Sequence, residues 1–218
     1  MLGHRLPPIA RTESFLEEIE RSMLLDWVFA NRERFRPAEV DDHGSMLVSP
    51  EVRQASTLRG IDSDLPWLLD RFRDVQAELL LKLGLTVPPI ESLEVELAAH
   101  GDGAHFAAHL DIAVGLRRQP LGGRPLRNDD RLLSAVYYFY KEPKGFTGGN
   151  LRLHPFGSEG HEVEGEAAPY LDVEPTQNTL VAFPSWATHE VRSISCPSGS
   201  FDDFRFAVNC WYCGRFGA

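Results

Sequence analysis

The second half of the chain is a series of short apolar segments separated by turn residues, and this pattern limits the fold more than any other feature. Between residues 93 and 97, leucine and valine alternate with glutamate, which is typical of a half-buried strand. Residues 132–140 are almost entirely apolar and aromatic, as expected of a central strand. Further strands are predicted at 106–114, 150–154, 179–183 and 204–212, with loops at 117–131 and 157–168. Such a succession of short strands is typical of a β-sandwich or barrel.

The first third of the chain has helical periodicity instead. Ser14 and Glu17 have the spacing of a capping box, and apolar residues at helical intervals continue to about Arg34. A second helix is predicted over 65–83, where Gly84 is a suitable residue to end it.

Helices followed by many short strands indicate a mainly β protein of the α+β class, with N-terminal helices buttressing a strand core. The length of 218 residues suits one large domain. We therefore expect 1–218 to form a single domain, with 1–91 as a helical lead-in and support and 92–213 as the strand core.

Charge and composition exclude several classes of function. The chain has 22 Lys and Arg against 32 Asp and Glu, and this net charge of −10 argues against binding to nucleic acid. It lacks both a long apolar run and the apolar segment of a signal peptide, so we expect no membrane span and no secretion. Its three cysteines are an odd number, which suits reduced thiols in the cytoplasm. Cys210 lies in a predicted strand, where residues i and i+3 point to opposite faces, so for Cys210 and Cys213 core or surface thiols are favoured over a redox or zinc pair.

Two His-x-Asp tripeptides are candidates for metal binding. One begins at His100 and is followed by glycines, which indicate a turn. The other comprises His109 and Asp111 and lies in an apolar predicted strand. Because residues i and i+2 of a strand project to one face, this imidazole and this carboxylate can converge on one ion.

His189 is the candidate third ligand, because it follows the predicted strand 179–183. Two histidines and one carboxylate on a β scaffold form the facial triad of non-haem Fe(II) oxygenases. Three ligands on one face leave three positions open, of which an α-keto acid can fill two and O₂ the third. Each histidine taken alone is equally well explained as a surface or core residue.

A series of motifs in the expected order resembles the 2-oxoglutarate/Fe(II)-dependent dioxygenases, and within them the prolyl-hydroxylase-like branch. Gly103, Phe106, His109 and Asp111 match Gly-x-x-aromatic-x-x-His-x-Asp. The later matches are the strand 135–140, the Gly-Gly-x-Leu-Arg segment within 146–153, the approach to the second histidine at 173–191, and Arg205 with Trp211.

This resemblance implies a fold, cofactors and roles for residues. The fold would be a double-stranded β-helix, or jelly roll, with iron held inside its open end. The iron ligands would be His109, Asp111 and His189. The cosubstrate 2-oxoglutarate would be bound by Arg205 through its C5 carboxylate, with Tyr138, His100, Leu151 and Val191 completing its pocket. Fe(II), 2-oxoglutarate and O₂ are the implied cofactors, and ascorbate is a further candidate.

Two positions depart from the family pattern. His100 stands where the family often has tyrosine, and its charge would depend on pH. Fifteen residues separate His189 from Arg205, more than prolyl hydroxylases typically carry, so Arg192 is the alternative partner of the cosubstrate.

The implied function is hydroxylation of an unactivated C–H bond in a prolyl, amino-acid-type or small-metabolite substrate, with formation of succinate and CO₂. The carboxylate of Asp111 favours hydroxylation over halogenation, because related halogenating enzymes have a small residue there. Arg53, Arg152 and Trp186 are candidates for substrate contact, each with a surface or core role as the alternative. Two other classes stay open: a cupin-like metal-binding protein that does not use 2-oxoglutarate, and a non-catalytic β-sandwich module. The sequence does not indicate the oligomeric state.

Overall fold

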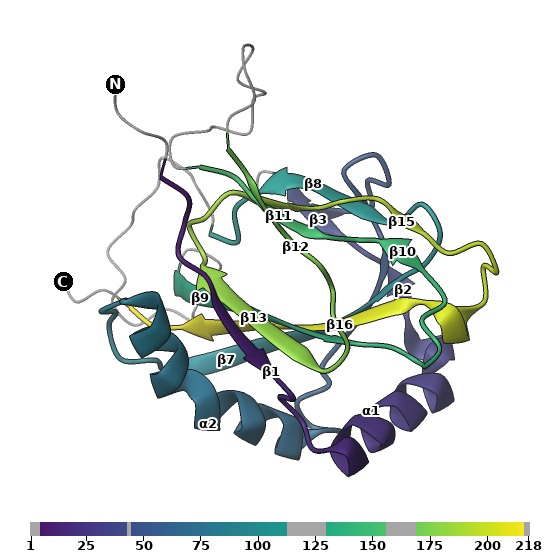
Figure 1. Cartoon of the computed structure of the whole chain (residues 1–218), viewed down its shortest axis with the longest axis horizontal. Helices are drawn as coiled ribbons and strands as arrows, with labels where there is room; N and C mark the ends of the chain where they lie inside the picture. The colour runs from purple at the N-terminus through teal and green to yellow at the C-terminus, as the bar shows by residue number, and fades with distance from the viewer. Residues whose placement is uncertain (1–4, 43–44, 113–129, 156–168, 216–218) are drawn as a thin grey trace.

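Two helices and two facing β-sheets make up the computed structural model, which describes residues 5–42, 45–112, 130–155 and 169–215. Helices α1 (Glu18–Ala30) and α2 (Pro66–Leu83) cover the outer face of the larger sheet, and the smaller sheet lies on its other side (Figure 1). No helix in these ranges is long and apolar enough to span a membrane.

The strands pair antiparallel throughout the two sheets. The seven-stranded sheet has the order β1 (Ala10–Glu13), β13 (Thr179–Pro184), β9 (Arg131–Phe139), β16 (Arg205–Cys213), β7 (Ser92–His100), β6 (Ser56–Arg59) and β2 (Arg36–Pro37). The five-stranded sheet has the order β12 (Leu171–Val173), β11 (Leu151–Leu153), β14 (His189–Val191), β8 (His105–His109) and β5 (Arg53–Gln54). Two further pairs are β3 (Val40–Asp42) with β4 (Ser45–Leu47), and β10 (Thr147–Gly148) with β15 (Ile194–Ser195). The prediction of a mainly β jelly-roll core with N-terminal helices is confirmed.

Alternation along β16 divides the interior into two parts. Phe206 and Tyr212 join the apolar core between the large sheet and the helices, whereas Ala207 belongs to the cluster between the two sheets. The period of two thus lets one strand complete a core on one face and line a pocket on the other. Cys210 and Cys213 are buried and unpaired, and burial raises the pKa of Cys213 to about 12, so both are inert core thiols as predicted.

The second helix is confirmed, and the first begins later than predicted. Gly84 ends α2 in the left-handed conformation, with φ of 63°. In α1 the capping box is formed by Glu17 and Glu20, not by Ser14 and Glu17. The reason is that β1 occupies the preceding residues by pairing with β13, and Ser14, with φ of 52°, turns the chain toward the helix.

The first 91 residues are more than the predicted helical lead-in, because they supply strands to both sheets. Strand β1 extends the large sheet beside β13, β6 extends it beside β7, and β5 adds to the small sheet beside β8. These strands have two to four residues, too few for a period of two to be visible. That the whole chain is one domain stays a prediction.

Strand boundaries in the second half differ from the prediction at one important place. Strand β8 ends at His109, so the predicted strand 106–114 stops before Asp111. Val114 and the predicted loop 157–168 lie outside the described residues, as do residues 117–129 of the other predicted loop.

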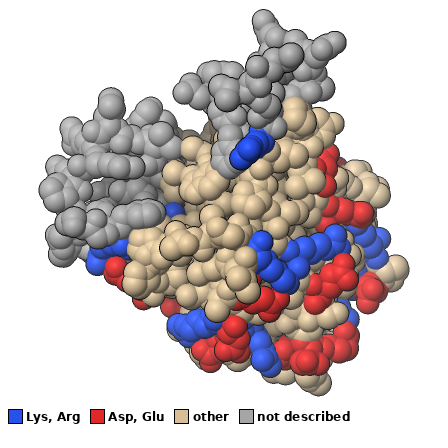
Figure 2. Space-filling model, turned by 60° about the vertical axis from the view of Figure 1, so that its left-hand side comes forward, with Lys and Arg blue, Asp and Glu red and all other residues tan. Residues whose placement is uncertain are grey.

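Charged side chains of both signs lie side by side on the face shown in Figure 2, where blue Lys and Arg alternate with red Asp and Glu. Ion pairs of opposite charge also occur along α2, where Arg73 pairs with Asp70 and Lys82 with Glu78. On the face shown in Figure 2 acidic side chains are therefore interspersed with basic ones rather than gathered into one acidic patch.

Two leucines of α2 test whether helix packing on the large sheet stabilises the fold. Leu79 is fully buried in the core, whereas Leu81 is 82% exposed. We expect Leu79→Ala to lower the free energy of unfolding by about 2–5 kcal/mol, because it leaves a cavity. The matched Leu81→Ala should change it by less than about 0.5 kcal/mol. Urea denaturation measures both, and equal losses would contradict this packing.

Candidate metal and cosubstrate site

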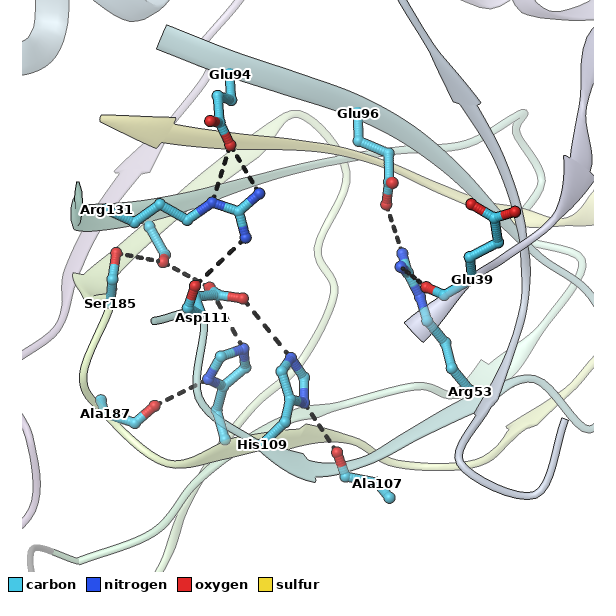
Figure 3. Close-up of polar contacts among 12 residues, drawn as sticks. Glu39, Arg53, Glu94, Glu96, Ala107, His109, Asp111, Arg131, Ser185 and Ala187 are labelled. Carbon is cyan, nitrogen blue, oxygen red and sulfur yellow. Dashed lines mark hydrogen bonds and ion pairs between the residues drawn. The ribbon is translucent and has the colours of Figure 1, made fainter. Parts of the chain in front are cut away.

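Two imidazoles and one carboxylate converge between the two sheets (Figure 3). His109 ends β8 and is paired with His189 at the start of β14. The Nε2 atom of His109 lies 3.7 Å from Oδ1 of Asp111, and Nε2 of His189 lies 3.7 Å from Oδ2. All the potential ligand atoms are within 4.8 Å of one another, so the three side chains can share one ion.

The hydrogen bonds of the two histidines leave the correct nitrogens for a metal. His109 Nδ1 donates to the carbonyl oxygen of Ala107 at 2.8 Å, and His189 Nδ1 donates to that of Ala187 at 2.9 Å. A neutral imidazole that donates from Nδ1 has its lone pair on Nε2. Burial, reinforced by the neighbouring His189, lowers the pKa of His109 to about 3, so this imidazole is neutral at physiological pH. The donor set therefore fits Fe(II).

Asp111 is held by contacts from β9 and from the turn after β13 rather than by a strand of its own. It lies in a bend after β8, so the predicted strand geometry for this residue is wrong. Its backbone N–H donates to the carbonyl of Ser185, and the hydroxyl of Ser134 donates to Oδ2 at 2.6 Å. Arg131 donates to its carbonyl oxygen at 3.3 Å. These bonds fix the carboxylate beside the histidines.

Arg205 is a buried cation that lacks a carboxylate partner among the described residues. It is 1% exposed, and Nη1 donates to the carbonyl of Gly149 at 2.8 Å. Its Nη2 lies 3.1 Å from Nε2 of His100, and its guanidinium carbon lies 5.2 Å from the ring centre of Tyr138. Nε is buried and has no hydrogen-bond partner in the described part of the chain. A buried guanidinium with unused donors fits an anionic ligand.

The structure contradicts the prediction that the charge of His100 depends on pH near neutrality. Burial and the positive charges of Arg205 and Arg53 lower the pKa of His100 well below its usual range. The imidazole is therefore neutral at physiological pH and accepts a hydrogen bond from Arg205.

One cavity joins the metal ligands to the predicted cosubstrate residues. It is lined by all eight predicted site residues: His100, His109, Asp111, Tyr138, Leu151, His189, Val191 and Arg205. The alternative arginine, Arg192, is half exposed and pairs with Glu190 outside this lining.

The three predicted substrate contacts are placed differently. Arg53 is buried and lines the cavity, where it pairs with Glu96. Arg152 pairs with Asp172, and neither it nor the half-exposed Trp186 lines the cavity.

Ser134 and Asn209 also line the cavity, and sequence reasoning missed both. Strand alternation contains the signal, because each lies four residues from a predicted site residue on the same strand face. Ser134 precedes Tyr138 on β9, and Asn209 follows Arg205 on β16.

A family model described as the 2OG-Fe(II) oxygenase superfamily matches residues 95–213, which are 119 of the 218 residues. The chain belongs to the 2OG-Fe(II) oxygenase superfamily. The matched segment begins in β7 and ends with β16, so it contains every residue of the candidate site except Arg53. Fe(II), 2-oxoglutarate and O₂ are the cofactors of this superfamily, and membership disfavours the cupin-like and non-catalytic alternatives.

Relatives of this oxygenase support the same placement. It is 32% identical over 142 residues to an "uncharacterized PKHD-type hydroxylase" of Synechocystis sp.. That alignment covers 65% of this chain but only 43% of the relative, so the chain spans less than half of that protein's length.

Solved structures show the shared fold. A prolyl-4-hydroxylase of Pseudomonas putida superposes with a TM-score of 0.60 at 21% identity, covering 95% of this chain and 94% of that one. A prolyl hydroxylase of Trichoplax adhaerens, in complex with a hypoxia inducible factor peptide fragment, gives 0.64 at 17% identity, covering 95% and 84%.

Ser134 offers a test of how the oxygenase holds its metal. We expect Ser134→Ala to weaken Mn(II) or Fe(II) binding about 10- to 100-fold, because the ligand carboxylate loses the bond that orients it. Ser185→Ala is the matched control, since Ser185 bonds to the Ser134 hydroxyl but reaches Asp111 only through its backbone. Anaerobic calorimetry measures the affinity, and equal effects of the two substitutions would contradict this role.

Proposed function

We propose that this oxygenase hydroxylates an unactivated C–H bond of a prolyl, amino-acid-type or small-metabolite substrate. The reaction consumes the substrate, 2-oxoglutarate and O₂, and it forms the hydroxylated product, succinate and CO₂. The observation that carries the proposal is the buried Arg205, which lines the same cavity as the three candidate ligands and has no carboxylate partner in the described chain.

His109, Asp111 and His189 would hold the metal through Nε2, a carboxylate oxygen and Nε2. Bound Fe(II) supplies the redox chemistry that couples decarboxylation of 2-oxoglutarate to C–H oxidation. The protein's contribution is to orient both imidazoles so that Nε2 is available to the metal, which the Nδ1 bonds to Ala107 and Ala187 provide.

Arg205 would bind the C5 carboxylate of 2-oxoglutarate, because a planar guanidinium can offer two parallel hydrogen bonds. His100 accepts from Nη2 and so aligns the guanidinium, and the hydroxyl of Tyr138 would donate to the same carboxylate. Leu151 and Val191 line the cavity with apolar surface, which limits water around the bound cosubstrate.

The substrate class and location rest on comparison and on composition. The Synechocystis relative is named as a hydroxylase, and the Trichoplax neighbour holds a peptide, which supports a prolyl or amino-acid-type substrate. The three cysteines are buried and unpaired, which supports a reducing, cytoplasmic location.

Arg205→Lys tests this function against the alternative arginine. We expect it to raise the KM for 2-oxoglutarate about 10- to 100-fold, because lysine keeps the charge but loses the paired hydrogen bonds. Arg192→Lys is the matched control and should leave the KM unchanged. A screen of amino acids, peptides and metabolites first identifies a substrate. The KM for 2-oxoglutarate is then measured from Fe(II)-dependent succinate formation. Failure of the unaltered protein to bind 2-oxoglutarate in the presence of the metal would contradict the function itself.

A further inference from the structure

The cavity contains a second buried guanidinium, that of Arg53, beside the candidate metal site. Arg53 is 8% exposed and belongs to β5 of the small sheet. Its Nη2 reaches Glu96 on β7 of the large sheet, at 2.5 Å from Oε1 (Figure 3). Its guanidinium carbon lies 4.8 Å from the ring centre of Phe106, and that ring stacks on His109 with centroids 3.6 Å apart. Arg53 is thus separated from a candidate metal ligand by one aromatic ring.

The carboxylate that pairs with Arg53 also pairs with a second arginine. Glu96 is the carboxylate that pairs with Arg53, and its other oxygen accepts from Nε of Arg59 at 2.9 Å. Two guanidiniums therefore share one buried carboxylate. Arg59 is half exposed and lies 3.9 Å from Glu39, so its charge is met by water and by a second acid. Buried Arg53 has Glu96 as its one carboxylate partner among the described residues, and it shares that carboxylate with Arg59.

Arg53 also has unused hydrogen-bond donors. Nε has no partner among the described residues, and Nη1 makes only a long contact of 3.4 Å to the carbonyl of Glu39. Its positive charge also contributes, after burial and Arg205, to lowering the pKa of His100.

Arg53 and Arg205 mark two different positions for an anion. In the register of β16 with β7, Arg205 is opposite His100 and Asn209 is opposite Glu96. Glu96 is the residue that holds Arg53. Four residues along a strand correspond to about 13 Å. Asn209, the register partner of Glu96, also lines the cavity and brings an amide to it.

We propose that Arg53, positioned by Glu96, binds a carboxylate of the substrate. The substrate is then a small molecule with a free carboxylate, such as an amino acid, rather than a residue inside a peptide. This inference rests on the proposed function, since it assumes that Arg205 binds the cosubstrate. The other source of a carboxylate at this position is the C1 end of 2-oxoglutarate, and the experiment separates the two.

The test compares carboxylic acids with their neutral amides. The protein loaded with Fe(II) and 2-oxoglutarate is given L-amino acids and the matching primary amides, including L-proline and L-prolinamide, and succinate release is measured. The variants are Arg53→Gln combined with Glu96→Gln, which removes the ion pair without leaving a lone buried charge, and Arg53→Lys, which keeps the charge. Arg59→Gln is the control. Arg59 is the other partner of Glu96, but it does not line the cavity.

We expect the unaltered enzyme to prefer at least one acid over its amide by about tenfold or more in kcat/KM. The double variant should lose this preference through a higher KM for the acid, and Arg53→Lys should reduce it. Arg59→Gln should retain it, and the KM for 2-oxoglutarate should stay unchanged in all variants. A loss of fold alone would not change the acid-to-amide ratio, so the ratio reports recognition.

Three results would overturn the inference. The first is that acids and amides behave alike, including no stimulation by either. The second is a double variant that keeps the preference, and the third is a KM for 2-oxoglutarate that rises in the Arg53 variants. The third result would assign Arg53 to the cosubstrate. Calorimetry with Mn(II) and 2-oxoglutarate distinguishes these outcomes from failure of the proposed function, in which the unaltered protein would not bind 2-oxoglutarate at all.

Discussion

The register of β16 in the large sheet is the constraint on which the fold and the site both depend. Its neighbours β7 and β9 fix it from both sides, over nearly its whole length. In this register Arg205, Asn209 and Trp211 line the cavity, while Phe206 and Tyr212 enter the core beneath the helices. A slip of one residue would exchange these two sets, burying a guanidinium in the core and filling the cavity with aromatic rings. The packing of the helices thus protects the geometry of the cavity.

Burying a charge in the cavity costs desolvation free energy unless an opposite charge or hydrogen bonds compensate it. The charges of this cavity are compensated to different degrees. Glu96 is buried, which opposes ionisation, but Arg53 and Arg59 lower its pKa overall. Arg205 has neutral groups around it, including the imidazole of His100 and a backbone carbonyl. An unpaired guanidinium in such surroundings favours binding of an anion, because binding relieves its desolvation. The net charge of −10 describes the whole chain, whereas two arginines and one aspartate line the cavity.

Sequence patterns predicted the parts of this structure that depend on local periodicity or on ordered motifs. The helix over 65–83 and the long strands carry clear periods, and the three candidate ligands stand in a motif series that the family match now supports. Strands β1, β5 and β6 were missed because two to four residues carry no readable period. The pairing of Arg53 with Glu96, 43 residues apart, could not be predicted, because it depends on how the two sheets face each other. The neutrality of His100 likewise follows from burial beside Arg205, which a sequence does not reveal.

A crystal structure with Mn(II) and 2-oxoglutarate, prepared without O₂, tests the central claim most directly. The account predicts one metal ion bound by Nε2 of His109, a carboxylate oxygen of Asp111 and Nε2 of His189. It also predicts the C5 carboxylate of 2-oxoglutarate on the guanidinium of Arg205. A metal ion bound elsewhere, or 2-oxoglutarate bound away from Arg205, would contradict it.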